Sequence, residues 1–402
     1  MEPADITWVA GPGREIRRAA QTDLPILGPL ATVTRLRAAY PDLAPAQISA
    51  ACAVAEAYIS HAGKLGANAE MLVLTDILAQ QATNPLVSTY RTQRLIAAGV
   101  KSVVDATSGA GLDALALDAG GLDVTAIELD AVTFACARAN LPELVEVLHG
   151  DARTIVPELL ATRPGTALFV DPARRDSTGP RRSDGSRAHA ERDPERWSPP
   201  WSWVCEMALL APTVAKVAPG IPLSLIPNGA TVEWISIGSE VVEACVWFAP
   251  LHDSASRRAT VISSAGAIES IDNFFDTTPA GISSIGEFLL EPHDAVKRAN
   301  LVDRLAAQCG ATRITPASTW LTGPSCESSL VRVWQVHNVV PVGELRDALR
   351  SFERVSYKTS DIDRSAQSMA SSVGHRAERD AHGEAWVVMI RDGAFAAIVQ
   401  PS

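Results

Sequence analysis

The sequence has no excess of basic residues and no long hydrophobic run. Its 402 residues carry a formal net charge of −11, so a nucleic-acid or anionic-membrane partner would need a local basic patch. The N-terminus lacks the basic segment and apolar run of a secretion signal, and no later stretch approaches the roughly 18 apolar residues that span a bilayer. The six cysteines are scattered, without a C-x-x-C pair or a neighbouring histidine cluster for zinc. These absences favour a cytoplasmic protein in a reducing environment, with no membrane and no metal partner.

The hydrophobic pattern changes along the chain and predicts an α/β protein. Apolar residues recur at helical spacing in "AQISAACAVAEAYISHAG" and "AEMLVLTDILAQQA". From residue 102 to about 265, short apolar runs alternate with helical stretches, which is typical of a parallel sheet with helices on both faces. We expect "IPLSLIP" to be the fifth strand, and "EACVWFA" and "RATVISS" to form an antiparallel pair at one edge. The expected organisation is a helical domain over 1–98, a sheet domain over 99–266, a connecting region over 267–328 and a small α+β domain over 329–402.

One stretch inside the sheet domain has almost nothing to bury. Residues 174–200 hold seven arginines and five acidic residues but almost no aliphatic side chains. Such a composition is typical of a surface loop, here one that a ligand could order.

The stretch "VVDATSGAGLDALAL" at residues 103–117 reads as a strand, a glycine turn and a helix. Gly109 and Gly111 allow the backbone to approach a ligand closely, and the helix N-terminus offers unpaired N–H groups. A G-x-G turn alone is weak evidence for a ligand site, because such turns also join strands to helices for purely structural reasons.

Acidic residues follow four successive predicted strands, at Asp105, Glu128, Asp151 and Asp171. The carboxyl ends of parallel strands form the ligand-binding edge of such sheets, so these acids together favour a nucleoside ligand. Glu128 stands 23 residues after Asp105, where a carboxylate accepts hydrogen bonds from ribose hydroxyls. Asp151, in "HGDA", is expected to accept from an adenine amino group.

The start of the predicted helix distinguishes between two nucleoside ligands. Asp113 stands where a dinucleotide would place its diphosphate, and an acid there repels phosphate. A cationic ligand without phosphate, such as S-adenosylmethionine, suits the position better.

Several stretches resemble the class I S-adenosylmethionine-dependent methyltransferases, and within them a bacterial group with a C-terminal THUMP-like domain. These stretches include "QATNPLVSTYRTQRL", "DATSGAGLDALAL", "AIELD", "FVDPARR", "WSPPWSWV" and "EPHDAVKRANLVDRLA". The resemblance implies a Rossmann-like methyltransferase sheet and activity on RNA (tRNA or rRNA). It implies cofactor contacts from Asp105, Thr107, Gly109, Gly111, Asp113, Glu128 and Asp151. Many class I enzymes have glycine where Thr107 stands.

"DPARR" at residues 171–175 lies where enzymes that methylate exocyclic amines have Asp or Asn, two prolines and an aromatic residue. In those enzymes the acid and the proline carbonyl orient the target nitrogen. Ala173 and Arg174 depart from that pattern, although a guanidinium can stack on a base or bind phosphate. We predict Asp171, Pro172 and Arg174 as the catalytic residues. Methylation of carbon through a cysteine adduct is disfavoured, because Cys205 lies on an apolar helix.

Other residues keep two interpretations. Trp201 or Trp203 could close over a base or simply pack on the sheet, and Lys358 could contact RNA or be a solvated lysine. Basic and acidic residues nearly balance over 331–381, so RNA binding there rests on the resemblance alone. Alternatives to an RNA methyltransferase are a non-catalytic RNA-binding protein with a nucleoside pocket and a nicotinamide-dependent oxidoreductase. The oligomeric state is left open.

Overall fold

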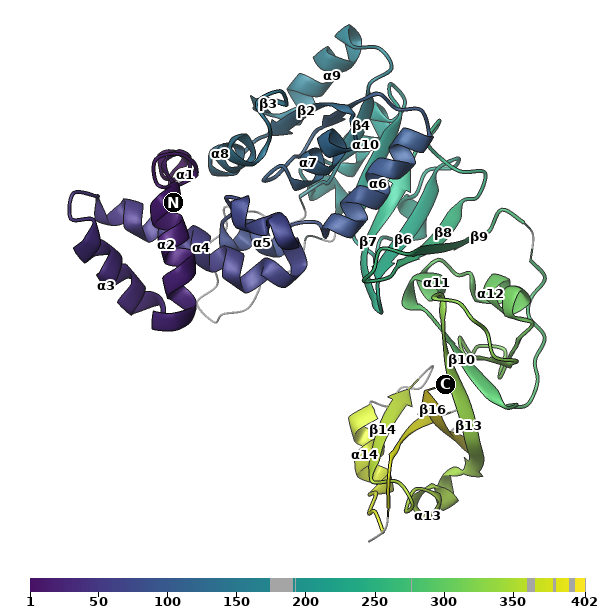
Figure 1. Ribbon diagram of the computed structural model, residues 1–402. Coiled ribbons are helices and arrows are strands. Elements are labelled where there is room, and N and C mark those ends of the chain that lie inside the picture. The colour runs from purple at the N-terminus through teal and green to yellow at the C-terminus, as the bar shows by residue number, and fades with distance from the viewer. Residues whose placement is uncertain are drawn as a thin grey trace. The chain divides into compact units, whose positions relative to one another are not determined.

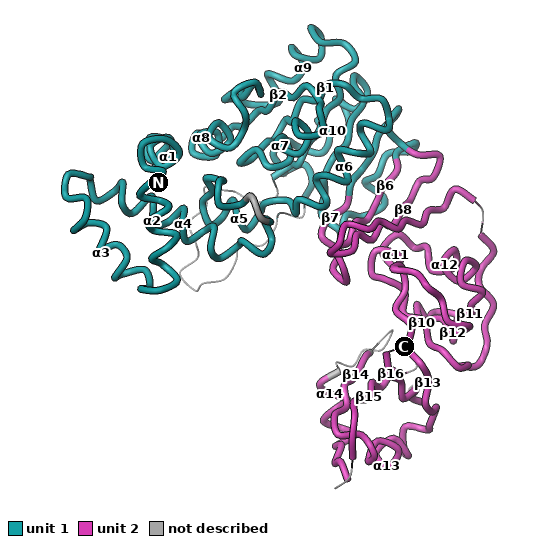
Figure 2. Tube along the Cα trace, in the orientation of Figure 1, with its two compact units in different colours: residues 1–230, 245–252 teal, residues 231–244, 253–402 magenta. Residues whose placement is uncertain are grey.

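The computed structural model describes residues 1–173, 191, 193–275, 277–359, 366–378, 381–389 and 395–401 (Figure 1). The chain forms two compact units (Figure 2). The first contains Met1–Ala230 and Cys245–His252, and the second contains Thr231–Ala244 and Asp253–Ser402. Most of the arginine-rich stretch, residues 174–190 and 192, lies outside the described residues, as does the predicted catalytic Arg174.

The first unit begins with helices, as the apolar spacing predicts. They are α1 (Pro3–Ala10), α2 (Arg14–Leu27), α3 (Pro29–Ala39), α4 (Pro45–Leu65), the 3₁₀ turn η1 (Ala67–Met71), α5 (Asp76–Gln81) and α6 (Pro85–Ala97). Proline occupies the first turn of α1, α3, α4 and α6, where its missing N–H has no intrahelical partner to lose. Thr75 and Asn84 cap α5 and α6 with their side-chain oxygens.

A parallel sheet follows, with strand order β3-β2-β1-β4-β5. Its strands are β1 (Ser102–Asp105), β2 (Asp123–Glu128), β3 (Glu146–His149), β4 (Ala167–Val170) and β5 (Thr213–Val217). The connecting helices are α7 (Leu112–Ala119), α8 (Ala131–Asn140), α9 (Ala152–Thr162) and, after the 3₁₀ turn η2 (Pro194–Arg196), α10 (Trp201–Met207). The four residues of β4 are all buried, which explains the unbroken apolar run "ALFV".

Two strand predictions are wrong. The fifth strand is "TVAKV" at Thr213–Val217, whereas "IPLSLIP" contains only the 3₁₀ turn η3 (Leu223–Leu225). Prolines at both ends of that run remove the N–H groups that a strand needs. The expected antiparallel pair is also absent among the described strands, because β8 (Arg257–Ile262) pairs with β6 (Thr231–Ile237) and with β9 (Ile268–Asp272).

The second unit contains β6, β8 and β9 and a second sheet. Strand β7 (Glu240–Trp247) has residues in both units. The second sheet has the order β11-β12-β10-β13-β16-β15-β14. Its strands are β10 (Phe288–Pro292), β11 (Thr312–Arg313), β12 (Leu321–Gly323), β13 (Val331–Pro341), β14 (Arg354–Thr359), β15 (Glu384–Met389) and β16 (Phe395–Pro401). The helices are α11 (Asp294–Arg298), α12 (Val302–Cys309), η4 (Val342–Glu344), α13 (Leu345–Ala348) and α14 (Ala366–Val373).

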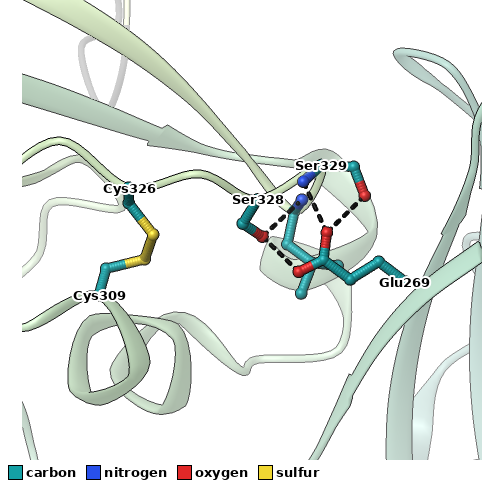
Figure 3. The surroundings of a disulfide bond; sticks show 6 residues. Glu269, Cys309, Cys326, Ser328 and Ser329 are labelled. Atoms are coloured by element: carbon teal, nitrogen blue, oxygen red, sulfur yellow. Dashed lines mark hydrogen bonds between the residues drawn. A yellow bond between two sulfur atoms is a disulfide. The ribbon is translucent and has the colours of Figure 1, made fainter.

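A disulfide joins two of the cysteines that the sequence shows far apart. Cys309, at the end of α12, bonds to Cys326 across 17 residues (Figure 3). Close by, the Glu269 carboxylate accepts hydrogen bonds from the hydroxyls of Ser328 and Ser329 and from the Ser329 backbone N–H. No cysteine motif marks this pair, which only the fold brings together.

Candidate functional site at the carboxyl edge of the first sheet

The glycine turn joins β1 to α7 and depends on glycine at two places. Gly109 has a φ of 55° and Gly111 a φ of 86°, which side-chain-bearing residues rarely adopt. A Cβ on Gly111 would also lie 2.9 Å from Leu141. The predicted turn therefore exists as a tight backbone loop at the sheet edge.

Asp105 ends β1 beneath this turn and is fully buried. The Thr107 backbone N–H donates to its Oδ1 at 3.3 Å, whereas its Oδ2 and the Ser108 hydroxyl find no partner among the described residues. Burial, with repulsion from Asp113 and Asp171, raises the pKa of Asp105 well above its usual value. Unsatisfied buried oxygens of this kind suit a ligand that brings hydrogen-bond donors and positive charge.

Asp113 lies in the first turn of α7 but does not present a free charge. The Arg91 guanidinium donates to its Oδ1 at 2.6 Å, and the Thr83 hydroxyl donates to its Oδ2 at 2.7 Å. Burial of Asp113 would raise its pKa, but Arg91 and then Lys216 outweigh that effect, and its pKa is lowered. The acid predicted to repel phosphate is thus an ion-pair partner inside the protein.

Asp171 follows β4 and is held from two sides. The Lys216 ammonium donates to its Oδ2 at 2.7 Å and to the Thr83 hydroxyl at 2.9 Å. The Asp171 backbone N–H donates to the Thr107 hydroxyl at 2.7 Å. Thr107, the departure from glycine, therefore ties the glycine turn to the end of β4.

Sequence patterns do not single out Lys216, Thr83 or Arg91. Lys216 is one polar residue in the apolar run "TVAKV", and that run was not predicted as a strand. Thr83 and Arg91 belong to "QATNPLVSTYRTQRL", which carries the family resemblance but has no recognisable ligand motif. Their partners become visible only when the sheet and α6 bring them together.

Glu128 and Asp151 differ in their surroundings. The Glu128 carboxylate accepts from the backbone N–H of Gly109 at 2.9 Å and of Asp130 at 2.8 Å, so it is joined to the glycine turn. Burial raises its pKa, although these two hydrogen bonds act in the opposite direction. Asp151 caps α9, and its carboxylate accepts from the backbone and guanidinium of Arg153.

The remaining described candidates make none of the side-chain hydrogen bonds of this network. Pro172 is buried, and Ala173 exchanges backbone hydrogen bonds with Ser198. Trp201 is buried in α10 and donates its indole N–H to the Leu225 carbonyl, as expected of a packed side chain. Lys358, in the second unit, donates to Glu291 at 2.8 Å.

Neither a metal site nor a membrane helix is found in the described part of the chain. No group of three or more His, Cys, Asp or Glu side chains there is arranged to hold a metal ion. None of the helices described is both long and apolar enough to cross a bilayer.

Comparisons with known proteins agree with this architecture, although no family model matches the sequence. A solved structure from Porphyromonas gingivalis, of a protein provisionally assigned as a methyltransferase, superposes with a TM-score of 0.73 at 18% identity. It covers 100% of this chain and 99% of its own, and it shows the shared fold alone. Two relatives, each named an uncharacterized S-adenosylmethionine-dependent methyltransferase, come from two strains of Mycobacterium tuberculosis. Each is 30% identical over 280 residues, which cover 65% of this chain and 70% of the relative. The chain therefore belongs to the S-adenosylmethionine-dependent methyltransferases.

Proposed function

We propose that this methyltransferase transfers its methyl group to a base nitrogen in RNA, with Asp171 orienting the acceptor. The observation that carries the proposal is the linkage of Asp171 to the glycine turn through the Thr107 hydroxyl. Family membership sets aside the nicotinamide-dependent oxidoreductase and the non-catalytic RNA-binding protein.

The residues around the turn fit the proposed cofactor site. The unpartnered Asp105 Oδ2 can accept from the ammonium of the methionine moiety, directly or through water. Glu128 keeps lone pairs for the ribose hydroxyls beside its two backbone donors. Asp151, whose partner Arg153 is exposed, would accept from the adenine amino group. S-adenosylmethionine supplies an activated methyl group when bound there.

The acceptor side follows from the two oxygens of Asp171. Lys216 holds Oδ2, while the described residues place no hydrogen-bond donor on Oδ1. Oδ1 can therefore accept an N–H of the target amine and direct the nitrogen lone pair toward the methyl group. The N–C bond would form as the bond between the methyl group and sulfur breaks, which leaves a neutral thioether, and the carboxylate would stabilise the positive charge on nitrogen until its proton passes to water.

Two features of the sequence support RNA as the acceptor: a stretch rich in arginine and the resemblance of the C-terminal domain to THUMP-like domains. Seven arginines lie within residues 174–196, directly after the Asp171–Pro172 pair. The C-terminal domain resembles THUMP-like domains, but its Lys358 is occupied by Glu291 and is a poor candidate for a phosphate contact.

Replacement of Asp171 tests the acceptor role. Asp171→Ala should reduce methyl transfer to total cellular RNA by roughly a hundredfold, because losing a charged hydrogen bond in the transition state costs about 3 kcal/mol. The affinity for S-adenosylmethionine, measured by calorimetry, should stay near the wild-type value. Asp123→Ala, at the opposite end of the strands, is the matched control. Wild-type turnover in Asp171→Ala, or methylation of a protein instead of RNA by the native enzyme, would disprove the proposal.

Replacement of Lys216 tests how Asp171 is held. Lys216→Met should lower kcat on the order of tenfold with little change in cofactor affinity, because Asp171 loses its anchor. Lys216→Arg can still donate to the carboxylate and should restore part of the rate. Equal kcat values for the methionine and arginine variants would contradict a positioning role for Lys216.

A further inference from the structure

The N-terminal helices and the glycine turn share one hydrophobic core. Buried residues of α1, α2 and α4, including Ile6, Ala20 and Val54, belong to the same cluster as Ala110 of the turn and Cys136 of α8. Helix α1 packs beside α8 (Figure 1). The helical segment is therefore packed directly against the elements that carry the proposed cofactor site.

Asn140, the last residue of α8, connects the two parts through its side-chain amide. Its Oδ1 accepts from the Val73 backbone N–H at 2.7 Å, and its Nδ2 donates to the Val73 carbonyl at 3.2 Å. The same Nδ2 donates to the Ala110 carbonyl at 3.0 Å. Ala110 stands between the two glycines of the turn, and the neighbouring Leu141 packs under Gly111.

We propose that Asn140 is a positioning residue for the cofactor turn and couples cofactor binding to the segment around Val73. A fixed Ala110 carbonyl sets the orientation of its own peptide group, whose Gly111 N–H donates to the Ser108 carbonyl at 2.8 Å, and so constrains the turn between Ser108 and Gly111. Coupling of this kind is reciprocal, so the bound cofactor also stabilises the contact at Val73. The inference rests on the proposal that this turn binds S-adenosylmethionine, and it is independent of the methyl acceptor.

Amide hydrogen exchange of the wild-type protein is the first test. Saturating S-adenosylmethionine should slow exchange at Gly109, Gly111 and Val73, while amides of α3, which lie away from the turn, keep their rates. If the glycine amides do not respond, the cofactor site is placed wrongly. If they respond and Val73 does not, or if α3 slows as much as Val73, the coupling is refuted and the site stands.

Substitution of Asn140 is the second test. Asn140→Asp keeps an acceptor for the Val73 N–H but replaces the donor to the Ala110 and Val73 carbonyls with a carboxylate oxygen that repels them, so we expect about tenfold weaker cofactor binding by calorimetry. The response of Val73 exchange to the cofactor should disappear as well. The matched control is Asn273→Asp. The Asn273 side chain also accepts a hydrogen bond from a backbone N–H, that of Arg257, but it lies in the second unit. Wild-type affinity in Asn140→Asp would overturn the inference, and the exchange test decides it if that variant does not fold.

Discussion

At the residue scale, Asp105 combines full burial, an unpartnered oxygen and a raised pKa. In the free protein, burial favours its neutral form. A cationic group that binds beside it favours the carboxylate and lowers the pKa. Binding should therefore release a proton over the pH range between the bound and free pKa values of Asp105.

This linkage predicts that the affinity for S-adenosylmethionine increases as pH rises through the raised pKa of Asp105 and levels off above it. Calorimetry in buffers of different ionisation enthalpy measures the released proton directly. Asp105→Asn cannot ionise, so its weaker binding should lack this pH dependence. A wild-type affinity that is flat with pH would show that Asp105 does not titrate with binding.

Sequence patterns predicted the acidic residues of the site but not the cations that pair with two of them, Asp171 and Asp113. Asp105 and Asp171 follow recognisable apolar runs, so their place at the sheet edge could be inferred. Lys216 and Arg91 have no motif, because a cation that pairs with a distant acid has no fixed spacing from it. The roles of the predicted site residues remain predictions.

At the scale of elements, the wrong prediction of the fifth strand shows that hydrophobicity alone does not locate a strand in the sequence. "TVAKV" has a lysine as its fourth residue, yet Val214 and Ala215 are fully buried and Lys216 reaches the site. "IPLSLIP" is more apolar, but its prolines cannot complete a strand ladder. Lys216 interrupts the apolar pattern of β5, and it is also the residue of that strand that holds Asp171 in the proposed site.

The disulfide between α12 and the segment before β13 gives a prediction about stability. Closing a loop of this length lowers the conformational entropy of the unfolded chain and should stabilise the folded state by about 3 kcal/mol. A reductant should therefore lower the urea midpoint of the wild-type protein, followed by tryptophan fluorescence. The double variant Cys309→Ser/Cys326→Ser should start at the lower midpoint and not respond to reductant. An unchanged wild-type midpoint would show that the bond contributes nothing.

At the scale of the whole molecule, the alternation of strands and helices predicted an α/β fold and the family resemblance predicted a methyltransferase fold, and both are confirmed. The helical character of the first hundred residues was also predicted, because its apolar spacing is regular. The close packing of those helices against the glycine turn could not be predicted, because it depends on the hydrogen bonds of Asn140 and on small core residues such as Ala110. The bounds of the four predicted domains and the THUMP-like identity of the last domain stay predictions.

The exchange of backbone hydrogen bonds between Ala173 and Ser198, at 2.8 and 3.0 Å, has a consequence for how acceptor preference could change during evolution. Ala173 and Ser198 form an isolated β-bridge, so described residues alone hold together the two ends of the intervening stretch. Replacing residues 174–190 with a short glycine-serine linker should leave S-adenosylmethionine affinity intact and abolish the proposed methylation of RNA. Loss of cofactor affinity would show that the stretch is not separable. If the stretch is separable, related enzymes could differ in this segment, and so in the acceptor they methylate, while the sheet that binds the cofactor stays the same.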